Sequence, residues 1–216
     1  MRSLTVMAFL LVFVLTACTD ESAPETNPDK KGDATIVKAD LTNFEKQLMD
    51  LSNYTAFAYD INLHNQKAKG LQVTVDHYEN GEKVNEVINV ESGLKGVKPS
   101  DHLRVVFLRQ KMNQGKEKWI GSIITDNGYG SSENIIDSPS ADYTSVTSGG
   151  IGSKTSFNIG KRQYAATIKH TNKTSVSQRT NLKTKEDIKK ATNYEQVYLL
   201  SVKLNEKTRD DKKSGK

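Results

Sequence analysis

Apolar and polar residues alternate with a period of two over several short segments, and this alternation restricts the fold more than any other feature of the chain. In the clearest segment the apolar positions are Phe57, Tyr59, Ile61 and Leu63. A period of two places successive side chains on opposite faces of a strand, which is typical of a half-buried sheet. We therefore expect a strand here, with its apolar face toward a core.

Related patterns recur along the chain and predict further strands. The expected segments are residues 71–78, 84–90, 103–111, 119–124, 155–159, 163–170 and 196–204. Asn80-Gly81 predicts a tight hairpin, because both turn positions favour positive φ, and we place Val84, Ile88 and Val90 on one face of the returning strand. Seven or eight short strands without βαβ alternation predict a mainly β fold, an antiparallel β-sandwich of immunoglobulin-like style.

Two helices are expected beside these strands. Between Asp40 and Ser52, apolar residues recur at spacings of three and four, namely Leu41, Phe44, Leu48 and Leu51. Such a stripe is usually buried, so we expect it to pack on the domain, with a partner-binding helix as the alternative. Thr42 and Glu45 have the spacing of a capping box, with Asp40 as the alternative cap. A short second helix, capped by Thr184 with Asp187, precedes the last strand. The predicted core includes Phe57, Tyr59, Ile61, Val73, Val75, Phe107 and Trp119.

The composition changes at both ends of this pattern. Residues 18–38 are polar and contain Pro24 and Pro28, so we interpret them as a flexible tether with too little apolar surface to fold. Residues 39–206 form the predicted β-rich globular domain with its leading helix. Residues 207–216 form a charged tail.

The first residues have the pattern of an export signal. Arg2 precedes an apolar run from Val6 to Leu15, which is short for a membrane span. The run ends in Leu15-Thr16-Ala17-Cys18, and these four residues resemble the lipobox of bacterial lipoproteins. The resemblance implies that residues 1–17 are a signal peptide, that cleavage precedes Cys18, and that Cys18 carries acyl chains such as palmitate.

This resemblance predicts where the protein resides. The chain has a single cysteine, so no intramolecular disulfide can form, and lipidation explains the lone thiol of an exported protein. We expect a cell-membrane protein that faces outside the cytoplasm, with the lipid bilayer as a partner through acylated Cys18. The alternatives for the apolar run are a buried core element or a retained membrane helix.

The charge pattern argues against nucleic acid as a partner. The net charge is +5, yet basic residues are spread along the chain and interleaved with acids. A mixed, solvated surface is the favoured interpretation, and weak attraction to anionic lipid or cell-wall polymer is the alternative.

Motifs for catalysis, cofactors and metals are weak, so we assign no catalytic residue, cofactor or metal. The four histidines have no short ligand spacing, although strand pairing could bring His77 and His170 together. The chain contains neither a Gly-x-Ser-x-Gly elbow nor a phosphate-binding glycine loop. A Ser–His–Asp triad dispersed along the sequence stays open.

Residues 127–153 are rich in Ser and Gly and are interpreted as a long loop. Long loops in compact domains often bind ligands, and the candidate binding residues are Tyr129, Glu133, Asp137, Asp142 and Tyr143. With Asp126, the acidic residues could offer oxygen ligands to Ca²⁺, but their spacing matches no known calcium loop. We expect that residues 130–149 can be deleted without loss of the fold.

Together these patterns predict a membrane-anchored extracytoplasmic lipoprotein that acts as a binding or accessory module at the cell envelope and is not an enzyme. Its partner would be an envelope protein or a cell-wall component. Two alternatives stay open, namely a cell-envelope hydrolase with a dispersed catalytic site and a regulatory or sensory lipoprotein that modulates a membrane protein.

Overall fold

A computed structural model describes residues 32–139, 142–178 and 182–208, so the predicted signal peptide and Cys18 lie outside the described residues. The described residues belong to one compact unit. Neither helix within the described ranges is long and apolar enough to cross a membrane.

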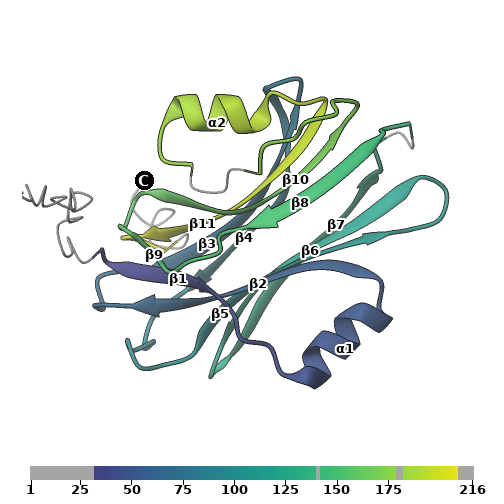
Figure 1. Ribbon diagram of the computed structural model, residues 1–216. Helices are drawn as coiled ribbons and strands as arrows, with labels where there is room; N and C mark the ends of the chain where they lie inside the picture. Colours follow the sequence, from purple (N-terminus) through teal and green to yellow (C-terminus); the bar gives the residue numbers. More distant parts are fainter. Residues whose placement is uncertain (1–31, 140–141, 179–181, 209–216) are drawn as a thin grey trace, which may run out of the picture. The chain divides into compact units, whose positions relative to one another are not determined.

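Within the described ranges, eleven strands form two antiparallel sheets, and this confirms the predicted mainly β sandwich (Figure 1). Sheet A has the strand order β7-β6-β5-β2-β1-β9 and consists of β1 (Ala34–Lys38), β2 (Tyr54–Leu63), β5 (Leu103–Lys111), β6 (Lys116–Thr125), β7 (Gly128–Asp137) and β9 (Thr155–Phe157). Sheet B has the order β4-β3-β11-β10-β8 and consists of β3 (Gly70–Glu79), β4 (Glu82–Gly93), β8 (Ser145–Gly150), β10 (Arg162–Thr171) and β11 (Gln196–Asn205).

The core lies between the two sheets and contains the residues that alternation predicts. Trp119 and Val73 are fully buried, and Phe107 is 1% exposed. Phe57 is partly buried and packs against this cluster. The alternating pattern therefore identifies the inner faces of β2 and β3 correctly, and residues 103–111 and 119–124, which do not alternate strictly, contribute Phe107 and Trp119 to the same core.

The globular domain begins earlier than predicted, because residues 34–38 of the expected tether form β1. Ala34 and Ile36 are fully buried between β2 and β9, which pair with the two edges of this strand. A segment of five residues that follows polar sequence is too short to show a clear alternation of apolar and polar residues, so its strand is not predicted. The tether prediction is wrong for this segment.

The hairpin at Asn80-Gly81 is confirmed, whereas the predicted face of Val84 is wrong. Asn80 and Gly81 both have positive φ, and Glu79 pairs with Glu82 across the turn. Two register shifts then interrupt the β3–β4 pairing, and a shift of one residue moves the following side chains to the other face. Val84 is consequently 49% exposed, while Ile88 is buried.

The predicted long loop at 127–153 is also wrong, because most of it forms β7 and β8. Asp126 and Asn127 make a two-residue turn between β6 and β7, and residues 138–144 connect β7 to β8. Backbone ladder bonds do not depend on side-chain polarity, so Ser-rich and Gly-rich sequence can pair at a sheet edge. Deletion of residues 130–149 would remove most of β7 and β8 from the two sheets, so the prediction that this variant folds is wrong.

The first helix, α1 (Asn43–Leu51), has the predicted capping box, in which Thr42 and Glu45 bond to each other's backbone N–H. Of the four residues in the predicted apolar stripe, Leu41, which precedes the helix, is partly buried, whereas the three within α1 do not pack on the domain. Phe44, Leu48 and Leu51 are 72%, 53% and 86% exposed. The burial prediction for this stripe is therefore wrong.

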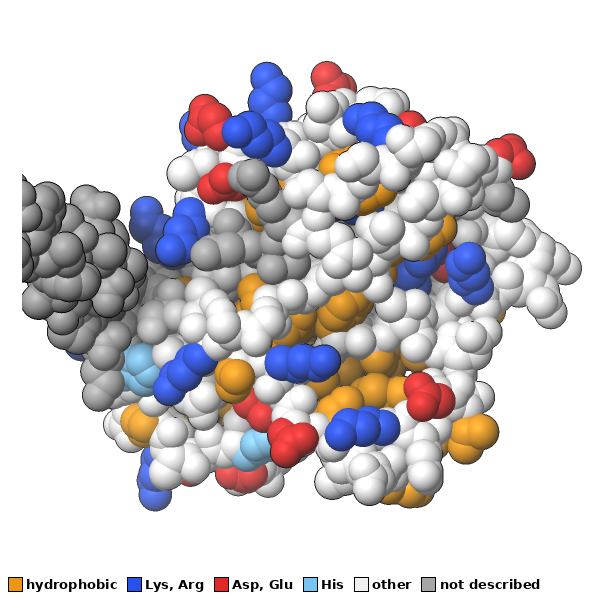
Figure 2. Space-filling view, viewed as in Figure 1, with side chains coloured by type: hydrophobic (Ala, Val, Ile, Leu, Met, Phe, Trp, Pro, Cys, Tyr) orange, Lys and Arg blue, Asp and Glu red, His pale blue; other side chains and the backbone are white. Residues whose placement is uncertain are grey.

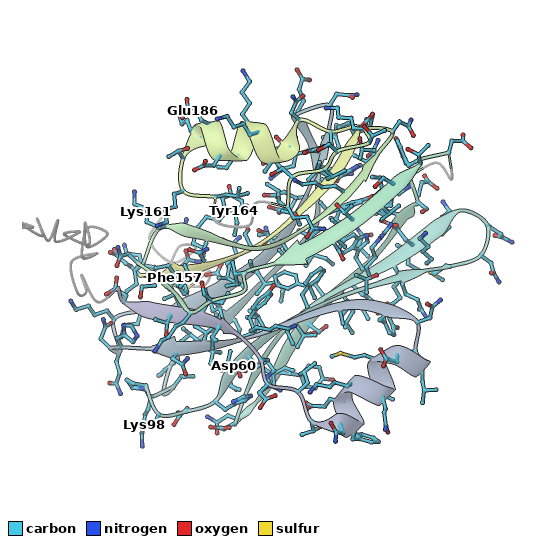
Figure 3. All side chains as sticks on the ribbon, in the orientation of Figure 1. Asp60, Lys98, Phe157, Lys161, Tyr164 and Glu186 are labelled. Carbon is cyan, nitrogen blue, oxygen red and sulfur yellow. The ribbon has the colours of Figure 1, made fainter. Side chains whose placement is uncertain are left out.

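The second helix, α2 (Lys185–Thr192), is confirmed with its Thr184 cap and covers the outer face of sheet B. It shares a small apolar cluster with the sheet and the preceding segment, made of Leu182, Ala191, Tyr194, Val197 and Leu199 with Tyr78, Tyr164, Val176 and Ile188 packed against it. Figure 3 shows Tyr164 below α2 and Glu186 at the start of that helix.

Candidate functional site

One side of the sandwich is closed and the opposite side is open. On the closed side, Asn134 of β7 donates a hydrogen bond to the Val87 carbonyl of β4, with a nitrogen–oxygen distance of 3.1 Å. On the open side, β8 is the free edge strand of sheet B, and two hollows of about 300 and 260 Å³ lie along it. Figure 2 shows apolar side chains exposed in this region between the sheets.

We call these two hollows together the β8 groove. Its lining includes Tyr59, Tyr143, Val146, Ser148, Gly150 and His170. The inner face of β8 is uncovered here, since Val146 is 50% exposed. The groove thus combines apolar side chains with an unpaired strand edge, which is a surface that an extended peptide can join.

At one end of the groove, Tyr59 sets how closely the two sheets approach. Its hydroxyl donates a hydrogen bond to the Ala165 carbonyl of β10 over 2.9 Å. A Cβ atom added at Gly150 would lie 2.1 Å from the Tyr59 hydroxyl oxygen, so only glycine fits. Burial raises the pKa of Tyr59 well above its usual range, and the phenol therefore stays neutral.

At the other end, Tyr143 and His170 form the wall of the groove. Their rings meet edge to face with centroids 5.9 Å apart. Val146 of β8 and Met112 of the β5–β6 turn complete an apolar rim around them. This end of the groove offers two aromatic rings and the methyl groups of Val146 and Met112. Such a surface suits an apolar or aromatic side chain of a ligand.

Behind His170 lies a buried ion pair between Arg109 of β5 and Glu117 of β6. The Arg109 Nη2 atom is 2.5 Å from one Glu117 oxygen, and Trp119 Nε1 donates to the other oxygen over 2.7 Å. Arg109 is also 3.0 Å from His170 Nε2. Both charges are fully partnered, so this cluster is a structural support for the groove wall.

His170 presents a neutral ring to the groove. Burial, reinforced by the positive charge of Arg109, lowers the pKa of His170 from 6.5 to about 4. A neutral imidazole next to Arg109 accepts a hydrogen bond from the guanidinium.

The free edge of β8 has an orientation that its pairing determines. Ile151, just beyond the strand, donates to the Ala165 carbonyl of β10 over 2.9 Å. In an antiparallel pair, successive residues direct their N–H and C=O groups alternately toward and away from the partner strand. By this alternation the backbone groups of Val146, Ser148 and Gly150 point away from β10, to the open side.

The structure separates most of the residues predicted to form a binding site. Tyr129, Glu133 and Asp137 lie along β7 at the opposite edge of sheet A. The Glu133 and Asp137 carboxylates pair with Lys118 and Lys116 at 2.7 and 2.5 Å. These carboxylates belong to surface ion pairs and do not converge.

Of the predicted residues, Tyr143 alone lines the groove, and Asp142 precedes it in the β7–β8 connection. Within the described ranges, no three His, Cys, Asp or Glu side chains are grouped to hold a metal ion. The carboxylates proposed as calcium ligands therefore form no metal-binding cluster among these residues.

His77 and His170 do not lie on neighbouring strands, because β11 separates β3 from β10. Both rings instead contact Tyr198 of β11, with centroid distances of 4.6 and 6.2 Å. In hydrogen bonds and ion pairs with described residues, His64 contacts the Gly32 carbonyl, His77 contacts Gln196 and Glu79, His102 contacts Asp60, and His170 contacts Arg109. None of these contact groups is a nucleophilic hydroxyl or thiol.

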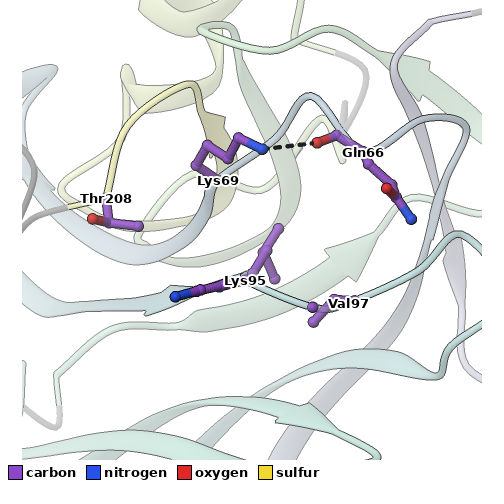
Figure 4. Close-up of a pocket in the computed structure, with 7 residues that line it drawn as sticks. Gln66, Lys69, Lys95, Val97 and Thr208 are labelled. Carbon is purple, nitrogen blue, oxygen red and sulfur yellow. Dashed lines mark hydrogen bonds between the residues drawn. The ribbon is translucent and has the colours of Figure 1, made fainter.

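A different hollow of about 470 Å³ lies beside the β2–β3 connection, lined by Lys69, Lys95 and Thr208 among others (Figure 4). Lys69 donates to the Gln66 carbonyl over 3.4 Å there. Its lining includes the buried Leu94 and Val97 but no aromatic side chain, whereas the β8 groove offers the rings of Tyr59, Tyr143 and His170 beside a strand edge. We therefore place the candidate site at the β8 groove.

Sequence reasoning missed the groove, because its parts come from β2, β8, β10 and the β7–β8 connection. Gly149-Gly150 ends β8, although glycine pairs suggest a loop. The one available signal is that glycine inside a strand often marks close approach of another group, here the Tyr59 hydroxyl.

Comparison with known families gives one match. The model of a family described as the YgaN domain matches residues 35–204. The match runs from the second residue of β1 to near the end of β11, so it includes the whole sandwich and the β8 groove. Searches of curated proteins and of solved structures returned no match.

Proposed function

We propose that this chain, which belongs to the YgaN domain family, is a lipid-anchored binding module outside the cytoplasmic membrane and takes an extended peptide segment of an envelope protein into its β8 groove. The module binds and does not catalyse. The observation that carries the proposal is the uncovered inner face of β8 beside a free strand edge.

The anchor is supported by the sequence. An apolar run of signal-peptide length ends at the lipobox-like Leu15-Thr16-Ala17-Cys18, and Cys18 is the chain's one cysteine. Acylation at Cys18 would keep the sandwich at the membrane surface, where envelope proteins are concentrated. Cys18→Ala is expected to abolish acylation and remove the protein from the membrane fraction.

Peptide binding is supported by the geometry of the groove. Strand addition at β8 would pair the outward backbone groups of Val146, Ser148 and Gly150 with a ligand strand, giving affinity that does not depend on ligand sequence. Alternate ligand side chains would then face the groove, where Tyr143 and Val146 offer apolar contacts. Specificity would come from these side-chain contacts.

Binding is favoured over hydrolysis by the contacts of the histidines. His170, the histidine in the groove, contacts Arg109 and the Tyr143 ring, and neither group can attack a substrate as an activated serine does. The depressed pKa of His170, about 4, also makes its neutral form a weak base.

Site-specific photocrosslinking in cells tests the proposal. A photoreactive amino acid replaces Val146 in the full chain, and Val84 is the matched control, since the two valines are 50% and 49% exposed on strands at opposite edges of sheet B. We expect one discrete protein adduct at Val146 in the membrane fraction and none at Val84.

Equal adducts at both positions, or no adduct at Val146, would contradict peptide binding at the groove. An adduct that muramidase digests would identify a cell-wall ligand in its place. If the adduct contains an integral membrane protein, its activity with and without this chain shows whether the module is regulatory.

A further inference from the structure

The apolar stripe of α1 is the largest solvent-facing apolar feature on a helix of the described structure. Phe44, Leu48 and Leu51 are all more than half exposed, and α1 has no buried residue. At roughly 100° per residue, these three side chains fall within a sector of about 60° on one side of the helix. Three large apolar side chains gathered on one exposed side usually mark a contact surface.

Polar contacts hold α1 in the rotation that exposes this stripe. Arg104 of β5 donates to the Glu45 carboxylate over 3.3 Å, and Arg104 also pairs with Asp60 of β2 at 2.7 Å. At the other end, Gln110 donates to the Ser52 carbonyl over 3.2 Å. Figure 3 shows Asp60 on the strand layer near the start of α1. The stripe is therefore fixed outward from the sheet.

We propose that the occupant of this stripe is the lipid bilayer itself, which α1 enters at the interface while the chain is anchored. The inference rests on the proposed acylation of Cys18. The 15 residues between Cys18 and Ala34 span at most about 50 Å even when fully extended, so the bilayer stays within reach of the domain. β1 then leads within five residues to α1.

The charges around the stripe indicate the mode of contact. Lys46 and Asp50 are the exposed charged residues of α1, and their charges cancel. Glu45 is directed to Arg104. The attraction is therefore apolar insertion into the interface, and it does not require anionic lipid or low salt.

A tryptophan placed in the stripe reports the contact. The acylated full chain carrying Phe44→Trp is reconstituted into phosphatidylcholine vesicles with and without brominated acyl chains, which quench nearby tryptophan. Lys46→Trp is the matched control, because position 46 faces away from the stripe on the same helix. Trp119, the chain's own tryptophan, is buried and supplies a constant background.

We expect brominated lipid to remove most of the added emission of Phe44→Trp and little of that of Lys46→Trp, equally at low and high salt. If the acylated chain floats with the vesicles but neither tryptophan is quenched, the α1 inference is overturned and the proposed anchor stands. A chain recovered from cells without acyl groups overturns both. A blue shift of Phe44→Trp in cell membranes without quenching by brominated lipid would assign the stripe to a protein partner and overturn bilayer contact.

Discussion

The two helices in the described part of the chain have similar starts but lie in opposite environments. Each has a threonine capping box, formed by Thr42 with Glu45 in α1 and by Thr184 with Asp187 in α2. Yet α2 shares an apolar cluster with sheet B, whereas α1 has no buried residue and turns its stripe to solvent. An amphipathic pattern and a good cap therefore predict a helix, but they do not predict what the helix faces.

The surfaces that the two sheets present to the helices explain why α2 is packed and α1 is exposed. The outer face of sheet B presents Val197 and Leu199, and the segment before α2 adds Leu182 to the same cluster. This layer also covers Lys169, which lies 4.5 Å from the Tyr194 ring centroid and is 1% exposed. Sheet A instead meets α1 through Arg104 and other polar groups. Burial of apolar side chains therefore holds α2 on sheet B, whereas hydrogen bonds and an ion pair position α1 on sheet A.

The largest effect is expected on the α2 side. Leu199 is fully buried under α2, so Leu199→Ala loses apolar contact and leaves a cavity. We expect the free energy of unfolding to fall by about 3 kcal/mol, within the usual range for buried leucines. Urea unfolding measures this change. A loss below about 1 kcal/mol would show that the α2 layer is loosely packed. The contrast between a packed α2 and an exposed α1 would then be wrong.

A smaller effect concerns Lys169 under the same layer. Burial lowers its pKa from 10.5 to about 8, so the unfolded state binds more protons than the folded state between these pH values. The charged form destabilises the fold fully below about pH 8, and stability is recovered as pH rises toward 10.5. Relative to Lys169→Met, the wild-type chain should gain roughly 1.5 kcal/mol between about pH 8 and 9.5.

Urea unfolding of the two chains, measured side by side at each pH, gives this difference. Groups that titrate in both chains contribute equally to the two free energies of unfolding, so their contribution cancels. A constant difference across that range would mean that water reaches Lys169 and that the α2 layer does not exclude it.

The smallest effect is expected on the α1 side. Leu51 is 86% exposed, so Leu51→Ala removes almost no buried contact. We expect the free energy of unfolding to stay within about 0.5 kcal/mol of the wild-type value. A loss comparable to that of Leu199→Ala, measured in dilute protein without lipid, would mean that α1 is packed in solution and would remove the contrast between the helices.

Much of the fold can be predicted from the sequence, because strand alternation, turn residues and helix caps are signals that lie within a few neighbouring residues. Alternation identifies the inner faces of β2 and β3, and Asn80-Gly81 identifies a turn whose positive φ values only a few residues adopt readily. Both helix starts follow from capping residues three positions apart. Each signal needs no information about distant residues.

The errors involve residues that pair across long stretches of sequence. β1 exists because β2 and β9 supply ladder partners, and β8 exists because β10 does, and composition does not show this. The rotation of α1 depends on Arg104, 59 residues beyond Glu45. The β8 groove likewise needs Tyr59 beside Gly150, so the binding residues predicted from one Ser-rich stretch, apart from Tyr143, lie elsewhere.

The most direct test of the account is a proline at position 148, on the edge of β8. By the strand's alternation the Ser148 N–H points to the open side, so Ser148→Pro removes no bond to β10 but blocks strand addition. With the photoreactive residue at Val146, we predict that Ser148→Pro unfolds at the same urea concentration as Ser148→Ala. Its yield of the protein adduct should be lower by about tenfold or more. A folded Ser148→Pro chain with an unchanged adduct would contradict peptide binding at the β8 groove.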